Sequence, residues 1–546
     1  MTDFFLHFCA MCYILADEKR EKRKEGMLMF QIFHTLSIAA AAQPQPGPAD
    51  RALEAVESVN GALNNIVWGW PALILLAFVG IFMTCRTKFF QVSHFVHWWK
   101  QTIGAIFSQK HVRTHTTDKS ISQFQSLCTA LAATIGTGNI VGVASALIAG
   151  GPGAIFWMWV VAFFGMMTNY SENVLGIYYR RKNERNEWSG GAMYYLKDGL
   201  GSYKGFKQIG AVLAVLFSIF CVMASFGIGN MSQINSISGN MKSAFGIPTY
   251  VTGIALLILA ALVIVGGLKR IASVTEKLVP FMAILYVAGA LVIFFMNIDQ
   301  CGAIFSAIFR GAFGLRAVGG GIVGSGVKLA LTWGMKRGVF SNEAGLGSSV
   351  MVHSSSNVKE PVRQGMWGIF EVFADTMIVC TLTAFVVLSS GLVDLETGAV
   401  LSSSEGSALV GEAFATRFGS AGPMFIAIAI LLFAFSTVLG WSHYGSKAWE
   451  YLFGTKSMIA YKIVFVLMIY VGATMNLGLA WDLSDTFNGL MAIPNLIGVL
   501  SLSPIVMKIT KNYVARVLKK EEIQPMLSAF PDIEETHAEE LKELYK

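Results

Sequence analysis

Apolar segments of about 18 to 29 residues, separated by polar loops, recur along almost the whole chain. A helix needs about 20 mostly apolar residues to cross a bilayer at 1.5 Å per residue. The pattern therefore predicts about eleven membrane-spanning helices. Their ranges are 68–85, 124–149, 154–179, 210–236, 249–268, 280–297, 320–348, 365–390, 421–446, 459–478 and 484–507.

The segment 124–149 differs from an ordinary membrane helix because its centre is polar and rich in glycine. This centre has the sequence TIGTGN, from Thr134 to Asn139. Non-helical backbone at membrane depth is tolerated only where it is buried in protein or lines a water-filled cavity. Freed carbonyls can hold a cation there, and freed N–H groups of the next half-helix can hold an anion. The segment therefore predicts half of a transport site.

The spans fall into two sets of five, at 124–297 and 320–507. An odd number of spans in each set gives the two sets opposite orientations in the membrane. The first span of the second set is again rich in helix breakers, including FSNEAGLG at 340–347. The predicted fold is an all-α polytopic membrane protein with a 5+5 inverted repeat. The first helix of each half is discontinuous, and one extra N-terminal helix precedes the repeat.

These features predict five regions along the chain. They are a leader at 1–57, the extra helix with an interfacial helix at 58–123, the first repeat at 124–297, the second repeat at 298–507 and a charged cytoplasmic tail at 508–546, expected to be solvated. The leader resembles a secretory signal or, alternatively, a disordered segment upstream of a start at Met27 or Met29. Amphipathic stretches at 91–108 and 303–315 are expected to lie in the membrane interface.

Composition supports a membrane protein, because only 14% of the residues are charged and the mean hydropathy is +0.56, whereas soluble domains average about 25% charged. The net charge of +7 is not interpreted as nucleic-acid binding, because Lys and Arg are concentrated in alternate loops. Counted after the first span, the loops on one side of the predicted topology, together with 508–520, carry 25 of them, and the loops on the other side carry four. The positive-inside rule then predicts an external N-terminus and a cytoplasmic C-terminus in a bacterial-type inner membrane. The seven scattered cysteines predict neither a metal site nor a disulfide framework.

The residue types at the first break suggest which ligands it could bind. The N–H groups of Thr137 and Gly138 stand at a half-helix N-terminus, where a carboxylate is favoured. Glycine at 136 and 138 lets the backbone approach a ligand closely. Carbonyls freed just before, those of Ala132, Thr134 and Ile135, suit Na⁺ or an ammonium group. The alternative for the glycines is small-residue helix packing, and the clustered Thr134, Thr137 and Asn139 favour the site.

Four motifs in this chain resemble the alanine or glycine:cation symporter family, also called the sodium:alanine symporter family. They are TALAATIGTGNI (Thr129 to Ile140), GGPGAIFWMWVVAFFG (Gly150 to Gly165), RGVFSNEAGLGS (Arg337 to Ser348) and FAFSTVLGWSHYG (Phe433 to Gly445). The resemblance covers roughly residues 58–510. It implies uptake of alanine or glycine coupled to sodium, or to protons in some members. The implied fold is similar to that of the bacterial leucine transporter, with one extra helix ahead of the core.

The resemblance also implies roles for single residues. Ser436 and Thr437 would complete a Na⁺ site with the carbonyls of the first break, or alternatively bond back to carbonyls of their own helix. Trp441 would form a wall of the substrate pocket, or be an ordinary interfacial tryptophan. Gln233 would lie at the pocket, with interhelical hydrogen bonding as its alternative. Leu331 and Gly334 would supply the wall from the second broken helix.

Four more polar residues have open roles. Glu371 and Asp375 are spaced i, i+4 within a predicted span, which makes them functional candidates, although pairing with Lys or Arg near the cytoplasmic end is favoured. Asn342 and Glu343 would either touch the substrate or lock the inner gate.

The expected function is symport of a small neutral amino acid into the cell by alternating access, with Na⁺ as the coupling ion and no cofactor. The chain contains neither HExxH nor GxSxG, so no enzyme is predicted. The alternatives are a proton-coupled symporter of another small amino acid, a transporter-like sensor and a channel. The expected partners are the substrate and membrane lipids, with no nucleic acid, and the oligomeric state is left open.

Overall fold

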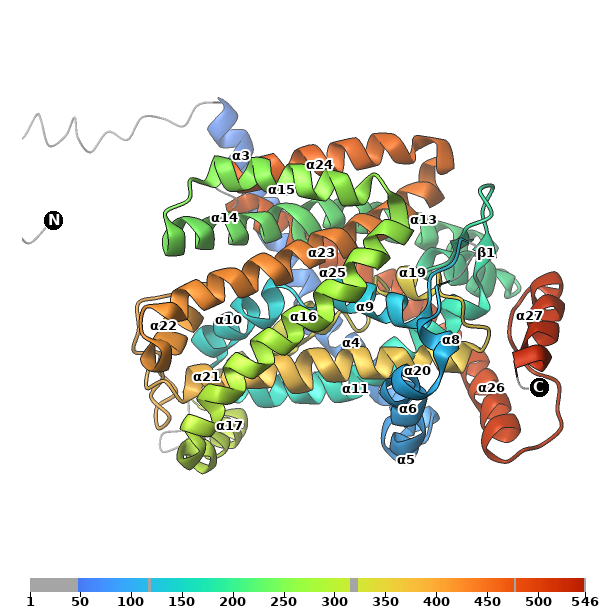
Figure 1. The fold of residues 1–546 in the computed structure, drawn as a ribbon, viewed down its shortest axis with the longest axis horizontal. Coiled ribbons are helices and arrows are strands. Elements are labelled where there is room, and N and C mark those ends of the chain that lie inside the picture. Colours follow the sequence, from blue (N-terminus) through green and yellow to red (C-terminus); the bar gives the residue numbers. More distant parts are fainter. Residues whose placement is uncertain (1–47, 116–118, 315–322, 476–477, 545–546) are drawn as a thin grey trace, which may run out of the picture. The chain divides into compact units, whose positions relative to one another are not determined.

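The computed structural model describes residues 48–115, 119–314, 323–475 and 478–544, with elements labelled as in Figure 1. Contacts divide the chain into residues 1–59 and 60–546. In the first unit, the described residues belong to helix α3 (Pro48–Val67). Most of the predicted leader at 1–57 lies outside the described residues.

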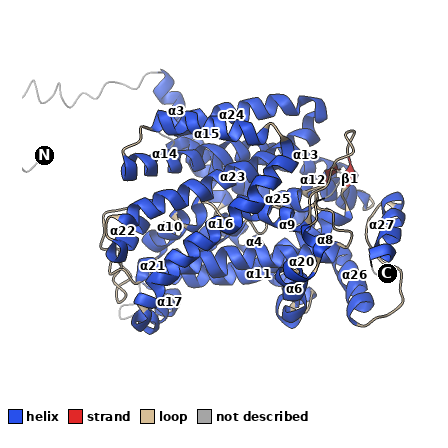
Figure 2. Cartoon of the chain, in the orientation of Figure 1, coloured by secondary structure: helices blue, strands red, loops and turns tan. Residues whose placement is uncertain are grey.

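The second unit is almost entirely helical (Figure 2), which confirms the predicted all-α class. Among the described residues, seven helices are long and apolar enough to cross a membrane, and two bent pairs raise the number to nine. All eleven predicted spans contain helix. The two outside the count of nine are α15 (Thr249–Ile264) and α18 (Val323–Asn342).

The main helical elements of the second unit belong to the two predicted halves. Those of the first half are α9 (Gln123–Thr134), the short 3₁₀ turn η1 (Thr137–Asn139), α10 (Val141–Gly150), α11 (Gly153–Tyr178), α13 (Lys207–Phe226), η4 (Gly227–Met231), α14 (Ser232–Phe245), α15 and α16 (Gly267–Met296). Those of the second half are α18, α19 (Val350–His353), α20 (Pro361–Val372), η6 (Phe373–Cys380), α21 (Thr381–Leu388), α22 (Gly406–Phe418), α23 (Ala421–Phe453), α24 (Met458–Thr474), α25 (Gly478–Ser501) and α26 (Ser503–Tyr513).

Shorter elements surround these helices. They are α4 (Trp70–Arg86), α5 (Phe90–Ser93), α6 (Phe95–Gln101), α7 (Ile103–Ser108), α8 (Lys110–Arg113), β1 (Arg181–Lys182), β2 (Trp188–Ser189), α12 (Ala192–Tyr194), η2 (Tyr195–Gly199), η3 (Leu200–Ser202), η5 (Ile298–Gln300), α17 (Cys301–Phe313), η7 (Thr455–Ser457), η8 (Val514–Leu518) and α27 (Pro531–Leu544). The two strands pair antiparallel, with Lys182 opposite Trp188.

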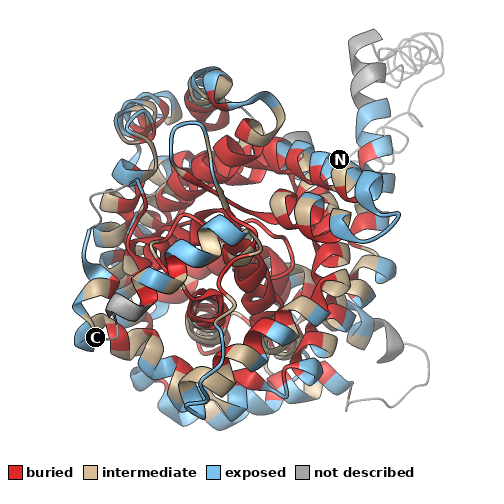
Figure 3. Cartoon of the chain, turned by 90° about the vertical axis from the view of Figure 1, so that its right-hand side faces the viewer, coloured by how far each residue is buried: buried red, intermediate tan, exposed pale blue. Residues whose placement is uncertain are grey.

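Two helices organise the packing of the second unit. Helix α11 packs along both α18 and α20, and α23 packs against α9, α13, α14 and α22; α11 and α20 lie side by side in Figure 1. Buried residues gather in the interior of the bundle, and exposed residues lie on its outside (Figure 3). The first helix of each half therefore contacts one of these two organising helices.

Helix α9 has a well-defined start and an abrupt end. The Ser122 hydroxyl accepts from the Gln125 N–H at 3.1 Å, and the Gln125 side chain accepts from the Ser122 N–H at 3.1 Å. This capping box fixes the first turn. The helix ends at Thr134, and the axis bends by 57° before the continuation that starts at Thr137. The break predicted within 124–149 is confirmed.

Helix α18 also stops within its predicted span. It ends at Asn342, and Glu343 adopts a left-handed backbone with φ of 57°, which is uncommon for a residue other than glycine. Gly345 and Gly347 continue the chain with φ of 95° and 73°. The Asn342 Oδ1 accepts the Ala344 N–H at 3.0 Å and supports this turn. The first helix of each half is therefore discontinuous.

Two peripheral segments differ from their predictions. The stretch 91–108 forms α5, α6 and α7, with joints at His94 and Thr102, where one amphipathic helix was predicted. Trp98 is buried and its indole donates to the Gln91 carbonyl at 2.9 Å. The acidic tail forms the predicted helix, α27, but it packs on the protein, since the Ala529 N–H before it donates to the Tyr178 carbonyl at 2.9 Å.

Candidate functional site

A cavity lies between the two helix breaks. It is narrow in this structure, with a cavity volume of about 20 Å³. Its lining residues are Ala133, Thr134, Gly136, Gly138, Ile228, Gln233, Phe340, Glu343, Thr437, Trp441 and Asn488. The first break, the α18 break and helix α23 each contribute to this lining. The structure thus brings together residues that are up to 355 positions apart in the sequence.

The predicted sodium ligands form one group beside this cavity. The hydroxyls of Ser436 and Thr437 both point at the Ala132 carbonyl, at 3.2 and 3.1 Å, and donate to it. Both also donate to the Phe433 carbonyl, at 2.8 and 3.1 Å. Ile135, the remaining predicted ligand, directly follows the end of α9 at Thr134. The bonds to the Phe433 carbonyl are the alternative expected for these hydroxyls, bonding back to a carbonyl of their own helix, and they occur together with the contacts to Ala132.

Glycine 136 allows the first break to approach helix α23. A Cβ at this position would lie 2.4 Å from Thr437 Oγ1 and 3.4 Å from Gln233 Oε1. Gly138 serves the same purpose toward the second break, because its Cβ would lie 3.2 Å from the Ser341 Cα. The two glycines predicted to admit a ligand therefore also permit close contact between the broken helices.

Several of the predicted substrate residues line the cavity. Thr134, Gly136, Gly138, Gln233 and Trp441 are among them. The Thr137 N–H, predicted to hold a carboxylate, donates to Gln233 Oε1 at 3.3 Å. The Thr137 hydroxyl is buried and has no hydrogen-bond partner within the described part of the chain. Such a group points to a ligand or a water at this position.

Thr137 is not itself a lining residue, although its neighbours Gly136 and Gly138 are. Asn139, Leu331 and Gly334 are not in the lining either. The Asn139 side chain stabilises the break from behind, since its Oδ1 accepts the Gly136 N–H at 2.9 Å. Leu331 lines a second, apolar cavity between α4, α11 and α18. Gly334 packs on α11, where a Cβ would lie 2.4 Å from the Ala154 carbonyl oxygen. In this structure the wall from the second broken helix is formed by Phe340 and Glu343 instead.

Asp375 connects both breaks. Its carboxylate accepts from Asn139 Nδ2 at 2.6 Å, from the Ser341 hydroxyl at 2.8 Å and from the Thr376 hydroxyl at 2.8 Å. Asn139 belongs to the first break and Ser341 to the end of α18. Asn342 joins the same element, donating to Thr376 Oγ1 at 3.0 Å. The expected pairing of Asp375 with Lys or Arg is wrong, because neutral donors surround it.

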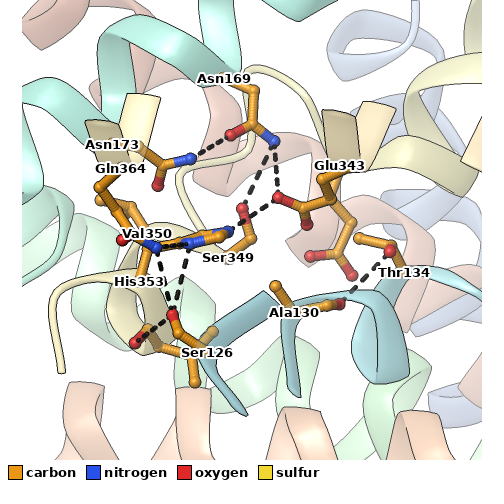
Figure 4. Close-up of polar contacts among 12 residues, drawn as sticks. Ser126, Ala130, Thr134, Asn169, Asn173, Glu343, Ser349, Val350, His353 and Gln364 are labelled. Atoms are coloured by element: carbon orange, nitrogen blue, oxygen red, sulfur yellow. Dashed lines mark hydrogen bonds and ion pairs between the residues drawn. The ribbon is translucent and has the colours of Figure 1, made fainter. Parts of the chain in front are cut away.

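Glu371 also lacks the basic Lys or Arg partner that was expected. Its Oε2 lies 3.0 Å from His353 Nε2, and both side chains are fully buried. Asn169 Nδ2 donates to the same oxygen at 3.3 Å, and Ser126 and Gln364 meet His353 Nδ1 at 3.4 and 2.5 Å. Figure 4 shows Ser126 and Gln364 meeting at His353, while Asn169 bonds with Asn173 and Ser349. This network joins α9, α11, α19 and α20.

An ion pair lies one turn from the cavity on two of its helices. Lys336 Nζ lies 2.6 Å from Asp485 Oδ2. Lys336 precedes the cavity residue Phe340 by one turn of α18, and Asp485 precedes Asn488 by one turn of α25. The Trp68 indole donates to the Asp485 carbonyl at 3.0 Å. The extra N-terminal segment therefore contacts this pair directly.

The chain was compared with known proteins. The model of the sodium:alanine symporter family matches residues 53–528. A sodium/alanine symporter from Methanococcus maripaludis is 46% identical over 84% of this chain and 97% of its own length. A probable sodium/glutamine symporter from Bacillus subtilis is 37% identical over 84% of this chain and 91% of its own. Among solved structures, that of MhsT in complex with L-phenylalanine has a TM-score of 0.46 and 14% identity, covering 72% of this chain and 99% of that one.

Proposed function

Because the chain belongs to the sodium:alanine symporter family, we propose that it uses the downhill entry of Na⁺ to take up a small neutral amino acid, alanine or glycine, by alternating access. Family membership makes the chain an integral membrane protein and a secondary transporter of amino acids, not an enzyme. The coupling ion, the substrate and the direction of transport are the parts that the proposal adds.

The observation that carries the proposal is the meeting of three oxygens at the first break. The Ala132 carbonyl and the hydroxyls of Ser436 and Thr437 lie together in a buried position. Hard, largely neutral oxygen ligands of this kind suit Na⁺ at a discontinuous helix. Thr437 also lines the cavity. Ion and substrate then share one wall, so that binding of either would order the break for the other.

The cavity supports a short amino-acid substrate. The carboxylate of the substrate would accept a hydrogen bond from the Thr137 N–H, which in this structure donates to Gln233 Oε1 at 3.3 Å. It would accept a second one from the Thr137 hydroxyl, which has no partner among the described residues. The aromatic side chains of Phe340 and Trp441 bound the space for the substrate side chain. Because the cavity volume is about 20 Å³ in this structure, the walls would have to move apart to admit the substrate, and the smallest side chains would require the least movement.

The distribution of basic residues supports the proposed orientation. The loops with 25 Lys and Arg would face the cytoplasm and those with four would face outside, in agreement with the positive-inside rule. The N-terminus would then be external and the C-terminus cytoplasmic, in a bacterial-type inner membrane. In this orientation α9 runs from the inside toward the cavity.

The test is uptake of labelled alanine and glycine into proteoliposomes under an inward Na⁺ gradient, and then under an inward H⁺ gradient alone. We expect accumulation above equilibrium only with Na⁺. Accumulation driven by H⁺ without Na⁺ would replace the proposal with a proton symporter, and no accumulation under either gradient would reject it. Thr137→Val should raise the KM for alanine while leaving the Na⁺ requirement in place.

A further inference from the structure

Glu343 stands out in the cavity because of its charge. Among the described residues that line the cavity, it is the only one with an ionisable side chain. Only 4% of the residue is exposed to solvent. A buried carboxylate costs several kcal/mol of desolvation unless another group compensates its charge. The cavity therefore contains a buried carboxyl group whose ionised form would require a cationic ligand.

The carboxylate is held in a fixed position. Trp441 Nε1 donates to Oε1 at 2.9 Å, and the Ser348 hydroxyl donates to Oε2 at 2.5 Å. The left-handed backbone at Glu343 turns the chain at the end of α18 and directs this residue to the cavity. Two donors leave further lone pairs of both oxygens available. The group is therefore oriented in advance, with room to accept from a ligand.

The electrostatic surroundings of Glu343 favour a cation. Its two hydrogen-bond donors are neutral. The carboxylates of Glu371 and Asp375 lie within electrostatic range of it, and Glu371 alone is paired with a histidine. The neutral donors leave the charge of an ionised Glu343 uncompensated, so this form attracts a positive group.

We propose that the Glu343 carboxylate binds the ammonium group of the transported amino acid. This inference rests on the proposed function. The substrate would lie across the cavity, with its carboxylate at the first break near Thr137 and its ammonium at the second break. Each of the two discontinuous helices would thereby bind one charged group of the amino acid. A 2-hydroxy acid of the same size, which lacks the ammonium, would leave Glu343 without a cation and be rejected.

The experiment compares alanine with L-lactate, in which a hydroxyl replaces the ammonium. Full-length protein in proteoliposomes with Na⁺ is measured for alanine uptake and for its inhibition by lactate. Glu343→Gln should lower the affinity for alanine about ten- to hundredfold, the range of a hydrogen bond to a charged group. The affinity for lactate should stay within twofold, so the preference for alanine should fall at least tenfold.

Two variants keep this test decisive. Glu450→Gln makes the same change at a buried glutamate that lies outside the cavity lining and is not among the charged groups acting on Glu343, and it should leave the preference for alanine unchanged even if uptake slows. If Glu343→Gln does not fold, Ser348→Ala removes the other donor that orients Glu343 without changing a residue of the cavity lining, and the preference should still fall by several fold. An unchanged preference in both Glu343→Gln and Ser348→Ala would overturn the inference.

The failure of this inference is distinct from that of the proposed function. Wild-type protein that accumulates alanine with Na⁺, together with a Glu343→Gln variant of unchanged preference, would reject the role of Glu343 alone. A variant that changes only the pH dependence of uptake would also reject it, because Glu343 would then carry a proton. Wild-type protein without Na⁺-driven accumulation would reject the proposed function itself.

Discussion

The side-chain amide of Asn139 donates to Asp375 Oδ1 across 2.6 Å, and the same Asn139 accepts the Gly136 N–H through its oxygen. One side chain therefore stabilises the first break with its acceptor and attaches it to helix η6 with its donor. Ser341, at the end of α18, donates to the other oxygen of Asp375. Movement at either break is coupled to the other through this carboxylate.

Exchanging the amide of Asn139 and the carboxylate of Asp375 tests this coupling. Asn139→Asp keeps the acceptor for the Gly136 N–H but places a second carboxylate against Asp375. Because an unpaired buried charge costs about 3–5 kcal/mol, we expect lower thermal stability and at least tenfold slower uptake. The double variant Asn139→Asp/Asp375→Asn restores one donor and one acceptor and should recover part of both losses. Thermal unfolding and uptake measure the cycle; additive losses would contradict the coupling.

Two glycines in one broken segment provide a matched pair of variants. Gly136→Ala places a methyl group 2.4 Å from Thr437 Oγ1, so helix α23 or the break must move, and we expect transport to be lost. Gly142→Ala adds the same methyl within α10, where nothing lies within 4 Å. That change should be neutral or stabilise by up to about 1 kcal/mol, because alanine favours helix. Equal effects of the two variants would contradict the close approach at Gly136.

The sodium site makes its own prediction. Thr437→Val is nearly isosteric and removes one ligand oxygen, so the Na⁺ concentration for half-maximal uptake should rise about tenfold, as expected for one lost charge-assisted contact. Ser436→Ala should act in the same direction. Ser442→Ala, on the same helix, removes a hydroxyl that only donates back to the Leu439 carbonyl at 2.6 Å, and its Na⁺ dependence should be unchanged. An unaltered Na⁺ dependence in Thr437→Val would remove it from the site.

The sequence predicted the elements that depend on local pattern. The breaks at Thr134–Asn139 and after Asn342 followed from glycines and polar residues in apolar segments, and the structure has both. The sequence could not predict the position of Leu331, because its i, i+3 spacing from Gly334 does not show which face of α18 lines the cavity. The partners of Glu371 and Asp375 were also beyond reach, since they lie on other helices brought near only by tertiary packing.

Docking of the C-terminal helix should depend on pH. His537 of α27 packs on the Trp188 ring with centroids 5.6 Å apart. Burial, together with the charges of Arg180, Lys359 and Lys182, lowers the pKa of His537 to about 2, against about 6.5 for a free histidine. Docking stability from the neutral ring is therefore complete above pH 6.5 and is lost as the pH falls toward 2.

Below pH 6.5, docking should weaken about tenfold for each pH unit, because one proton is taken up on release. Hydrogen exchange of the α27 amides between pH 7.5 and 5.5, corrected for the intrinsic rate, measures this slope. His537→Gln removes the titrating group, so its slope should be flat. A variant that kept the wild-type slope would assign the pH dependence to another group.

The ion pair of Lys336 and Asp485 is expected to close the predicted outer side of the cavity. The two side chains bridge α18 and α25 one turn from Phe340 and Asn488, and Asn64 also donates to Asp485 Oδ2, at 3.3 Å. Asp485→Asn removes the attraction between the helices. Opening should then become easier, and alanine should dissociate about three- to tenfold faster, within the range of one partly buried pair.

Charge reversal separates a gate from a simple structural contact. Lys336→Asp alone should speed dissociation of labelled alanine in rapid-dilution experiments, and Lys336→Asp/Asp485→Lys should slow it again because the pair is re-formed with opposite polarity. Lys328→Ala changes an exposed lysine on the same helix and should leave the rate unchanged. If the double variant releases alanine as fast as the single variant, the pair does not act as a gate, and the contacts of Trp68 and Asn64 hold this end closed.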